Sequence, residues 1–392
     1  MNKIYLDHAA TTYVKPAVME EMAKYFTEVF GNASSMHAFG REGASGLSKA
    51  RNTIASEIGA LPTEIYFTAG GSESDNWALR GIAKRKGKGH IITSCIEHPA
   101  IKETAEDLQK QGFEVTYVGV SEDGYVNPQE IENAIQDNTI LISVMVANNE
   151  VGTIQPFEEI AKIAKSRKIP FHTDAVQAMG AVKFNVKEMG IDMLSMSGHK
   201  FYGPKGIGVL YIRNGLGIGK YLTGGHQERG MRAGTSATPL AVGMAAALKL
   251  ANSHIEEENA RLSELRNYLV KRISAEIPYV KINGGLEKRL PNNVNISFKY
   301  VEGESILMLL DLAGIAVSTG SACSSGTLES SYVLTSMKVP IELAHGSVRF
   351  TLGEKTTKED LDTTVDKLKE IIEKLREMSP LFSVKEGETQ YV

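Results

Sequence analysis

The sequence has little cysteine and no long uncharged apolar run. It holds two cysteines, Cys95 and Cys323, in 392 residues, which excludes a disulfide framework and favours a reducing compartment. No apolar stretch approaches the ~20 residues of a membrane span, and the chain reaches Asp7 too early for a signal peptide. A net charge of −4 argues against direct nucleic-acid binding. These absences predict a soluble, cytoplasmic protein.

Apolar and helical segments alternate through the first two thirds of the chain. Short apolar runs, which predict strands, are separated by amphipathic stretches that predict helices; the runs lie at 4–6, 65–68, 90–94, 113–118, 139–146, 170–173, 191–194 and 207–212. The run at 139–146 is apolar throughout nearly its whole length, as expected for a strand buried on both faces. The pattern predicts an α/β fold with a mostly parallel sheet and helices on both faces.

The pattern changes after Thr238 and Pro239. Residues 240–277 predict one long helical stretch, Pro278 ends it, and we place a domain boundary within it. Strands are predicted at 279–282, 293–298 and 347–351, helices at 304–311 and after a possible capping box at 356–359. We therefore expect a large domain at 13–255, and a small α+β domain made of 1–12 with 256–392.

A reactive lysine follows a group of phosphate donors at residues 197–200, Ser-Gly-His-Lys. Ser197, the Gly198 N–H and His199 offer donors to an anion, and Lys200 comes next. A lysine beside phosphate donors suits a Schiff base with pyridoxal phosphate (PLP). The alternative is a lysine in a polar surface turn.

Other polar residues follow predicted strands, where parallel α/β sheets bind their ligands. Gly71 and Ser72 open a helix whose N–H groups can receive a phosphate. Asp174 could pair with a protonated ring nitrogen and keep it charged, with Gln177 near the ring hydroxyl. The competing interpretation of Asp174 is a helix N-cap.

Two further positions carry the same ambiguity. His98 opens a helix, where it could stack on an aromatic ring or simply satisfy the helix start. Asn148, Asn149 and Glu150 end an apolar strand, and polar groups so placed need partners. A ligand and main-chain loop bonds are the two candidates.

Cys323 lies in a small, polar segment without apolar periodicity, which is typical of an exposed loop. A thiol in such a loop is better explained as a working nucleophile than as a core residue, whereas Cys95 closes an apolar strand and fits the core. Arg349 alternates with apolar residues in a predicted strand. It should bind an anion, either a protein carboxylate or a substrate carboxylate held by two hydrogen bonds.

Taken together, these motifs resemble the cysteine desulfurases of the NifS/IscS family, among the fold-type I, class V PLP enzymes. The resemblance covers nearly the whole chain and is carried by the segments YLDHAATT (5–12), TAGGSESDN (68–76), EHP (97–99), NNEVG (148–152), DAVQ (174–177), SGHK (197–200), RAGT (232–235) and the Cys323 loop. It implies a seven-stranded large domain and a small domain that carries the catalytic cysteine.

The resemblance also implies a role for each motif residue. Lys200 anchors PLP and moves the Cα proton, and His98 stacks on the ring. Asn149 and Arg349 position the substrate, and Cys323 takes its sulfur as a persulfide. The cofactor set implied is Gly71, Ser72, His98, Asn149, Asp174, Gln177, Ser197, His199, Lys200 and Thr235. Thr235 is expected to reach the partner subunit's phosphate, which implies a homodimer.

Partners and competing functions follow from the same resemblance. Ser72 stands where the family commonly has threonine, and keeps the hydroxyl. The stretch 318–332 resembles the long-loop group, which hands sulfur to an acceptor protein, either an iron–sulfur scaffold or a tRNA-thiolation enzyme. No resident metal is expected, and transient ligation of an iron–sulfur cluster by Cys323 stays open. The tail from Ser379 resembles a scaffold-docking end but is short. Alternatives are a selenocysteine lyase, a class V aminotransferase or lyase, and a sulfur-relay binding protein without catalysis.

Overall fold

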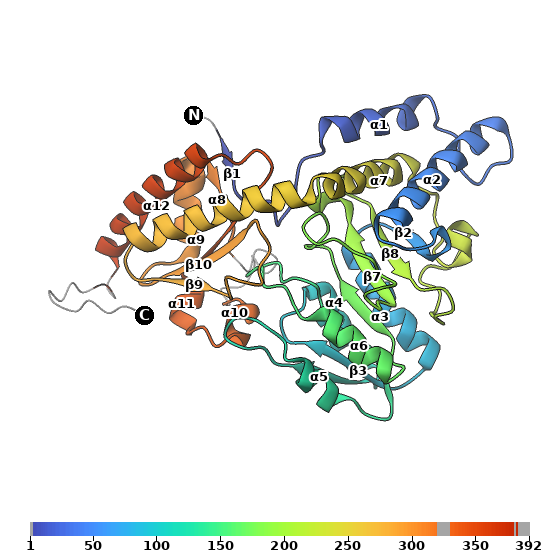
Figure 1. The fold of residues 1–392 in the computed structure, drawn as a ribbon, viewed down its shortest axis with the longest axis horizontal. Helices are drawn as coiled ribbons and strands as arrows, with labels where there is room; N and C mark the ends of the chain where they lie inside the picture. Colours follow the sequence, from blue (N-terminus) through green and yellow to red (C-terminus); the bar gives the residue numbers. More distant parts are fainter. Residues whose placement is uncertain (1–2, 320–329, 380–381, 383–392) are drawn as a thin grey trace.

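The computed structural model describes residues 3–319, 330–379 and 382. Its centre is a seven-stranded sheet in which β8 runs antiparallel to both of its neighbours, while the other neighbouring pairs are parallel (Figure 1). The spatial order is β2 (Ile65–Thr68), β8 (Gly208–Ile212), β7 (Met193–Ser197), β6 (Phe171–Asp174), β5 (Thr139–Ser143), β3 (His90–Ser94) and β4 (Glu114–Val118). The predicted mostly parallel sheet is confirmed.

The central strands are buried on both faces, whereas β4 at the edge is only half-buried, and consecutive side chains of the central strands enter different cores. Ile92 and Ile142 belong to a core beneath α2 (Ala38–Glu57), α6 (Phe157–Ser166) and α7 (Thr238–Ser253). Ile91 and Leu141, one residue earlier in each strand, face the core beneath α3 (Gly71–Lys86) and α4 (Pro99–Lys110). Such alternation is what a pleated strand with two covered faces requires.

Proline and glycine define the starts of several helices. Pro16, Pro99 and Pro128 each occupy the first turn of a helix, where a missing N–H costs nothing; these are α1 (Pro16–Thr27), α4 and α5 (Pro128–Ala134). By contrast, α3 begins at Gly71 directly after β2 and has no side-chain cap hydrogen bond. Its first N–H groups are thus not taken by a capping side chain.

The C-terminal helices and strands pack around a second hydrophobic core of their own. An antiparallel sheet of β12 (Ser347–Thr351), β10 (Asn293–Phe298) and β9 (Val280–Asn283) packs against α8 (Ile255–Glu276), α9 (Gly303–Leu312) and α12 (Lys358–Met378). From the other end of the chain, β1 (Ile4–Tyr5) pairs in parallel with β11 (Ile315–Ala316). These elements lie together on the left of Figure 1.

Four sequence predictions need correction. The strand expected at 139–146 is shorter, because β5 ends at Ser143. The single helix expected at 240–277 is two, because His254 takes non-helical angles (φ −125°, ψ 15°) between α7 and α8, and three glutamates fill the first turn of α8. Strand β7 is Met193–Ser197 rather than 191–194. The capping box of α12 is formed by Thr357 and Asp360, one residue later than expected.

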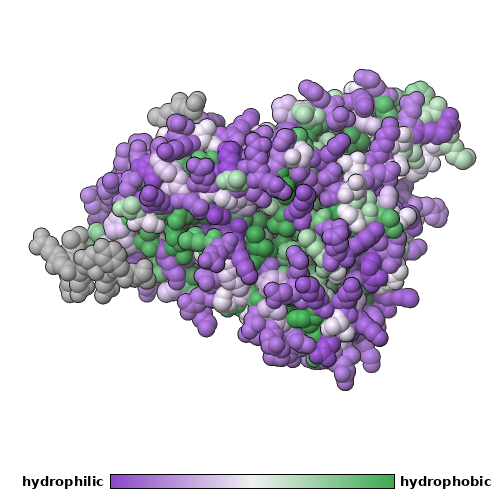
Figure 2. All heavy atoms as spheres, in the orientation of Figure 1, coloured by the Kyte–Doolittle hydropathy of each residue, from purple (hydrophilic) through white to green (hydrophobic). Residues whose placement is uncertain are grey.

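The surface in Figure 2 is mainly hydrophilic, with paler and green atoms at the end where α1 and α2 meet (upper right). Large apolar side chains are exposed in that region: Phe26, Phe30, Met36 and Phe39. Within the described residues, none of the helices is long and apolar enough to span a membrane.

Candidate active site

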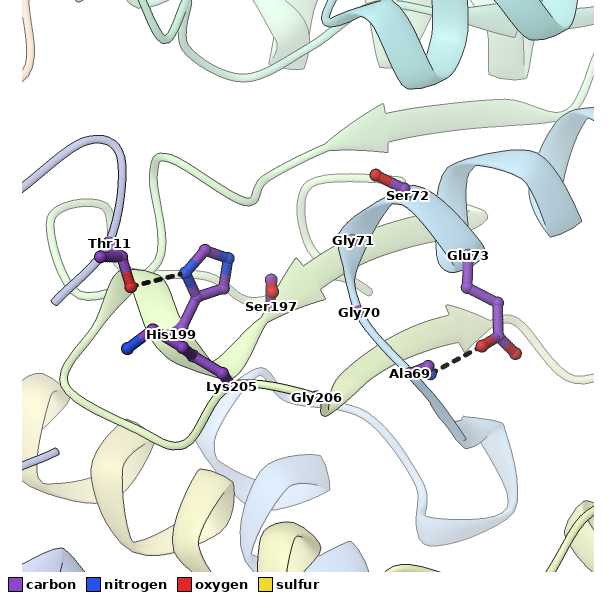
Figure 3. A pocket seen from close by; sticks show the side chains of 10 residues that line it. All are labelled: Thr11, Ala69, Gly70, Gly71, Ser72, Glu73, Ser197, His199, Lys205 and Gly206. Atoms are coloured by element: carbon purple, nitrogen blue, oxygen red, sulfur yellow. Dashed lines mark hydrogen bonds between the residues drawn. The ribbon is translucent and has the colours of Figure 1, made fainter. Parts of the chain in front are cut away.

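A cleft of about 470 Å³ opens where β7 ends and α3 begins (Figure 3). Ser197 and His199 lie on one side of it, and Gly70, Gly71 and Ser72 on the other. The full lining is Thr11, Ala69, Gly70, Gly71, Ser72, Glu73, Ser197, His199, Lys205 and Gly206. Four predicted phosphate-binding residues, Gly71, Ser72, Ser197 and His199, are therefore brought together here.

The glycines of this cleft are required by close packing. A Cβ on Gly71 would lie 2.7 Å from Val176 Cγ2, and one on Gly208 would lie 2.6 Å from the Gly70 backbone. Both distances are too short for real carbon atoms. Glycine at 208 therefore lets β8 lie against the turn between β2 and α3, and glycine at 71 lets the start of α3 lie against Val176, which follows β6 (Phe171–Asp174). The result is a helix N-terminus open to the cleft, which is a favourable place for a phosphate.

His199 is held as a neutral ring at the cleft wall. Its Nδ1 lies 3.1 Å from Thr11 Oγ1 (Figure 3). Burial, with the nearby charges of Lys200 and Lys205, lowers the pKa of His199 to about 4. The residue can thus offer hydrogen bonds near neutral pH without changing its charge.

Lys200 and Gln177 converge on the N-terminal segment. Lys200 ends the short 3₁₀ turn Gly198–Lys200 after β7, and its Nζ donates to Ala9 O (2.5 Å) and Ala10 O (3.0 Å). Gln177 Nε2 also donates to Ala9 O (3.0 Å). Lys200, the predicted PLP anchor, and Gln177, the predicted partner of the ring hydroxyl, therefore donate to the same oxygen, Ala9 O.

Asp174 is buried and His98 is half-buried, and both lie near Lys200. Burial raises the pKa of Asp174, while the charges of His98 and Lys200 oppose that rise. Burial likewise lowers the pKa of His98. Asp174 Oδ1 accepts from Val176 N (2.8 Å) in a turn rather than a helix, and His98 Nδ1 accepts from Ala100 N (3.1 Å) as the N-cap of α4.

Two buried acids behind Asp174 were missed by the sequence reasoning. Burial raises the pKa of Glu97 to about 8, and raises the pKa of Asp75 well above its ordinary value; the charge of Asp174 adds to both effects. Glu97 Oε1 accepts from Ser94 Oγ (2.5 Å) and Met145 N (3.0 Å), whereas within the described part of the chain Glu97 Oε2 has no hydrogen-bond partner. A sequence signal existed, because both acids lie in motifs that also carry site residues.

The two asparagines at the end of the apolar run at 139–146 differ. Asn148 is bound by the main chain: its Nδ2 donates to Ile96 O (2.8 Å) and its Oδ1 accepts from Glu150 N (2.8 Å). The loop-bond interpretation therefore holds for Asn148. Asn149 is half-buried, and its backbone oxygen accepts from Arg349 Nη1 (2.8 Å).

Arg349 is buried in β12 and already has a protein carboxylate. Its Nη2 is 2.9 Å from Asp7 Oδ1, while its Nε has no hydrogen-bond partner among the residues that the structure describes. Of the two alternatives from the sequence, the protein carboxylate is the one observed. The unpartnered Nε leaves donor capacity for a second anion.

The remaining predicted residues lie elsewhere. Thr235 is exposed and is absent from the lining of the cleft, although Arg232, three residues earlier, forms an ion pair with Glu73 at the cleft (2.8 Å). Cys323 lies outside the described residues. Cys95 follows β3, is partly buried and packs beside an apolar cluster, and burial raises the pKa of its thiol, as the core interpretation predicted.

The cleft also contains residues that the sequence reasoning did not assign. Thr11, Glu73 and Lys205 all line it. Thr11 and Glu73 lie within the motifs quoted above. The sequence therefore places them near the site, but it does not show that their side chains point into the cleft. Lys205 follows the Ser-Gly-His-Lys motif by five residues and adds a positive charge where an anion is expected.

Comparisons with known proteins agree with this geometry. The family model for class-V aminotransferases matches residues 4–364. A protein of Clostridium botulinum (strain Kyoto / Type A2) described as "Cysteine desulfurase IscS" is 54% identical over 388 residues, covering 97% of this chain and 98% of its own length. A solved "NIFS-LIKE PROTEIN" is 38% identical with a TM-score of 0.89, covering 95% of this chain and 100% of its own. A structure described as "SspA in complex with cysteine" is also 38% identical, with a TM-score of 0.80, covering 90% of this chain and 99% of its own.

Proposed function

The chain belongs to the class-V aminotransferase family, among its cysteine desulfurases, and on that premise we propose that it uses PLP to move sulfur from L-cysteine to Cys323. The family is PLP-dependent. The observation that carries the proposal is the position of Lys200 beside Asp174, His98 and Gln177, next to a cleft that can hold a phosphate.

The residues of the cleft fit this cofactor. Ser72, Ser197 and His199 supply donors, and the open N-terminus of α3 at Gly71 supplies N–H groups. Lys200 would hold PLP covalently, His98 would lie against the ring, Asp174 would pair with the ring nitrogen, and Gln177 would contact the ring hydroxyl. When bound, PLP acts as the electron sink that makes the Cα proton of an amino acid removable.

The protein's own groups account for the rest of the reaction. The amine of Lys200 can take and return a proton at the substrate Cα. Arg349 and Asn149 hold the substrate, and the Nε of Arg349, which has no partner among the described residues, is available to the carboxylate of L-cysteine. The Cys323 thiolate attacks the substrate sulfur. The net step breaks the Cβ–S bond, forms an S–S bond on Cys323, and leaves L-alanine.

The test uses Cys323→Ser. This variant should keep the absorbance of lysine-bound PLP but lose both L-alanine and persulfide formation, measured by amino-acid analysis and by mass spectrometry after alkylation. Lys200→Ala should lose the lysine-bound absorbance. If Cys323→Ser made alanine and persulfide at the normal rate, the assignment of the thiol would be wrong. Faster turnover of L-selenocysteine than of L-cysteine would favour the lyase, and amino transfer to a keto acid without sulfur release would favour an aminotransferase.

A homodimer is part of the same proposal. Thr235 is exposed beside the Arg232–Glu73 ion pair, so it is accessible to a second subunit's cleft. The exposed apolar side chains near the start of α2 include Phe30, Met36 and Phe39, and such a cluster suits a subunit interface. Light scattering and the loss of cofactor affinity in Thr235→Ala test it. A monomer with full PLP affinity would refute the proposal.

The division of the chain and its cellular role are likewise proposals. The separate core of the C-terminal elements, which includes Ile4 and Leu6, supports a small domain of 1–12 with 256–392 and a large domain of 13–255. A cytoplasmic location suits a thiol that must stay reduced.

The persulfide would pass to an acceptor protein, an iron–sulfur scaffold or a tRNA-thiolation enzyme, which affinity capture with the persulfide-loaded enzyme would identify.

A further inference from the structure

Two described residues, one before and one after the Cys323 segment, are hydrogen-bonded to residues of the substrate-binding region. Before the segment, Ser318 pairs with Arg349 through two backbone hydrogen bonds, Ser318 N to Arg349 O (3.2 Å) and Arg349 N to Ser318 O (2.6 Å). After it, the Ser331 hydroxyl donates to Glu150 Oε2 (2.5 Å). Ser331 is also the N-cap of α10 (Tyr332–Ser336), where it accepts from Leu334 N (3.2 Å).

Glu150 connects Ser331 to Arg349 through hydrogen bonds and its neighbour Asn149. It directly follows Asn149, whose backbone oxygen accepts from Arg349 Nη1 (2.8 Å). Glu150 and Arg349 are each only 4% exposed. The path therefore runs from Ser318 through Arg349, Asn149 and Glu150 to Ser331, and it passes through both residues assigned to hold L-cysteine.

A buried carboxyl group in this position needs an explanation. Burial raises the pKa of Glu150 to about 7, although the Ser331 hydroxyl and the charge of Arg349 oppose that rise. The Ser331 hydroxyl is the donor, so a carboxyl oxygen can accept it whether Glu150 is ionised or protonated. The bond can thus hold its geometry throughout the physiological pH range.

Resting on the proposed function, we propose that Glu150 is a positioning residue for sulfur transfer. Its carboxyl group holds Ser331 against the loop that carries Asn149, so the chain leaving the cysteine segment is fixed to the same groups that hold L-cysteine. Attack on the substrate sulfur requires the reacting atoms to come within about 3–3.5 Å, and a misplacement of about 1 Å can cost about 100-fold in rate. A purely structural role is the alternative, since α10 also packs through Val333 and Leu334.

The experiment separates sulfur transfer from substrate binding. The variants are Glu150→Ala and Ser331→Ala, which remove the bond, and Glu150→Gln, whose amide oxygen can still accept it. Ser330→Ala is the matched control, because its hydroxyl is adjacent but lies 3.5 Å from Thr335 Oγ1 instead. Each holoenzyme is assayed for alanine formation from L-cysteine. Each variant is also made in a Cys323→Ser background, where the PLP absorbance change on mixing with L-cysteine reports binding and proton removal without sulfur transfer.

We expect Glu150→Ala and Ser331→Ala to lower kcat for alanine by about 10- to 100-fold, with KM within about twofold. Glu150→Gln and Ser330→Ala should stay near wild type, and the absorbance change in the Cys323→Ser background should not slow. A raised KM at unchanged kcat, or a slowed absorbance change, would overturn the proposal, as would normal kcat in both Ala variants. If Glu150→Ala loses PLP, the kcat of Ser331→Ala for alanine formation alone tests the proposal. Failure of wild type to form alanine and persulfide would instead refute the proposed function.

Discussion

Replacing Glu97 by glutamine should change how stability depends on pH. Glu97 is completely buried, and burial raises the pKa of its carboxyl group from 4.5 to about 8. Because the folded protein holds this proton more tightly than the unfolded chain does, the contribution of Glu97 is fully present below about pH 4.5. It is lost as the pH rises towards 8. Glutamine has the shape of the protonated acid and does not titrate.

The magnitude follows from the two pKa values. One pKa unit corresponds to about 1.4 kcal/mol, so the whole interval represents about 5 kcal/mol, and the part between pH 5.5 and 8.5 about 3 kcal/mol. Relative to Glu97→Gln, the wild type should lose about that much free energy of unfolding over this range. Contributions from all distant titrating groups cancel in the comparison. Asp174 and Asp75, which face Glu97, remain in both proteins.

The assay is a thermal scan of both holoenzymes, saturated with PLP, at pH 5.5, 7 and 8.5. The midpoints should differ least at pH 5.5, and the variant should lie higher by about 3–6 °C at pH 8.5. Glu159→Gln, at an exposed position on α6, is the control and should show no pH-dependent difference. A difference between wild type and Glu97→Gln that is the same at all three pH values would refute the idea that Glu97 is buried as the neutral acid.

Two further substitutions test the cleft and the substrate site. Gly71→Ala places a Cβ 2.7 Å from Val176 Cγ2, so PLP affinity, titrated on the apoenzyme, should fall by about tenfold or more; unchanged affinity would remove Gly71 from the phosphate site. Arg349→Lys loses the planar fork that also holds Asp7, so KM for L-cysteine should rise by about tenfold in steady-state assays while the PLP absorbance is kept. An unchanged KM would mean that another cation holds the substrate carboxylate.

The sheet was largely predictable because its central strands are buried on both faces and their apolar runs stand out. The exception, β7, shows where that signal fails. Its last residues are Ser195, Met196 and Ser197, and a partly polar end does not resemble a buried strand. In the fold, Ser195 Oγ lies 3.0 Å from His172 Nε2 on the neighbouring strand, so the polar side chains satisfy one another. Such pairing across strands cannot be seen in one sequence.

The break between α7 and α8 was missed for a related reason. No glycine or proline marks position 254, and the weak helix formers Asn252 and Ser253 before it do not by themselves end a helix. The acidic first turn at Glu256, Glu257 and Glu258 is visible in the sequence, but acidic residues also occur on the exposed face of an uninterrupted helix. The site residues, by contrast, were predicted from short motifs. That these residues lie together in one site was predicted mainly from the family resemblance, and not from apolar periodicity.

The buried acids show what the motifs alone could not predict. Asp174 can stabilise a positive ring nitrogen only if it keeps a negative charge, yet burial works against that charge. If Glu97 and Asp75 were also ionised, the three charges would repel one another in a poorly hydrated interior. Their raised pKa values favour the protonated forms of both acids and so weaken that repulsion, while the charges of His98 and Lys200 oppose the rise in the pKa of Asp174. The pH dependence predicted for Glu97 therefore also tests whether a neighbouring acid is neutral beside Asp174.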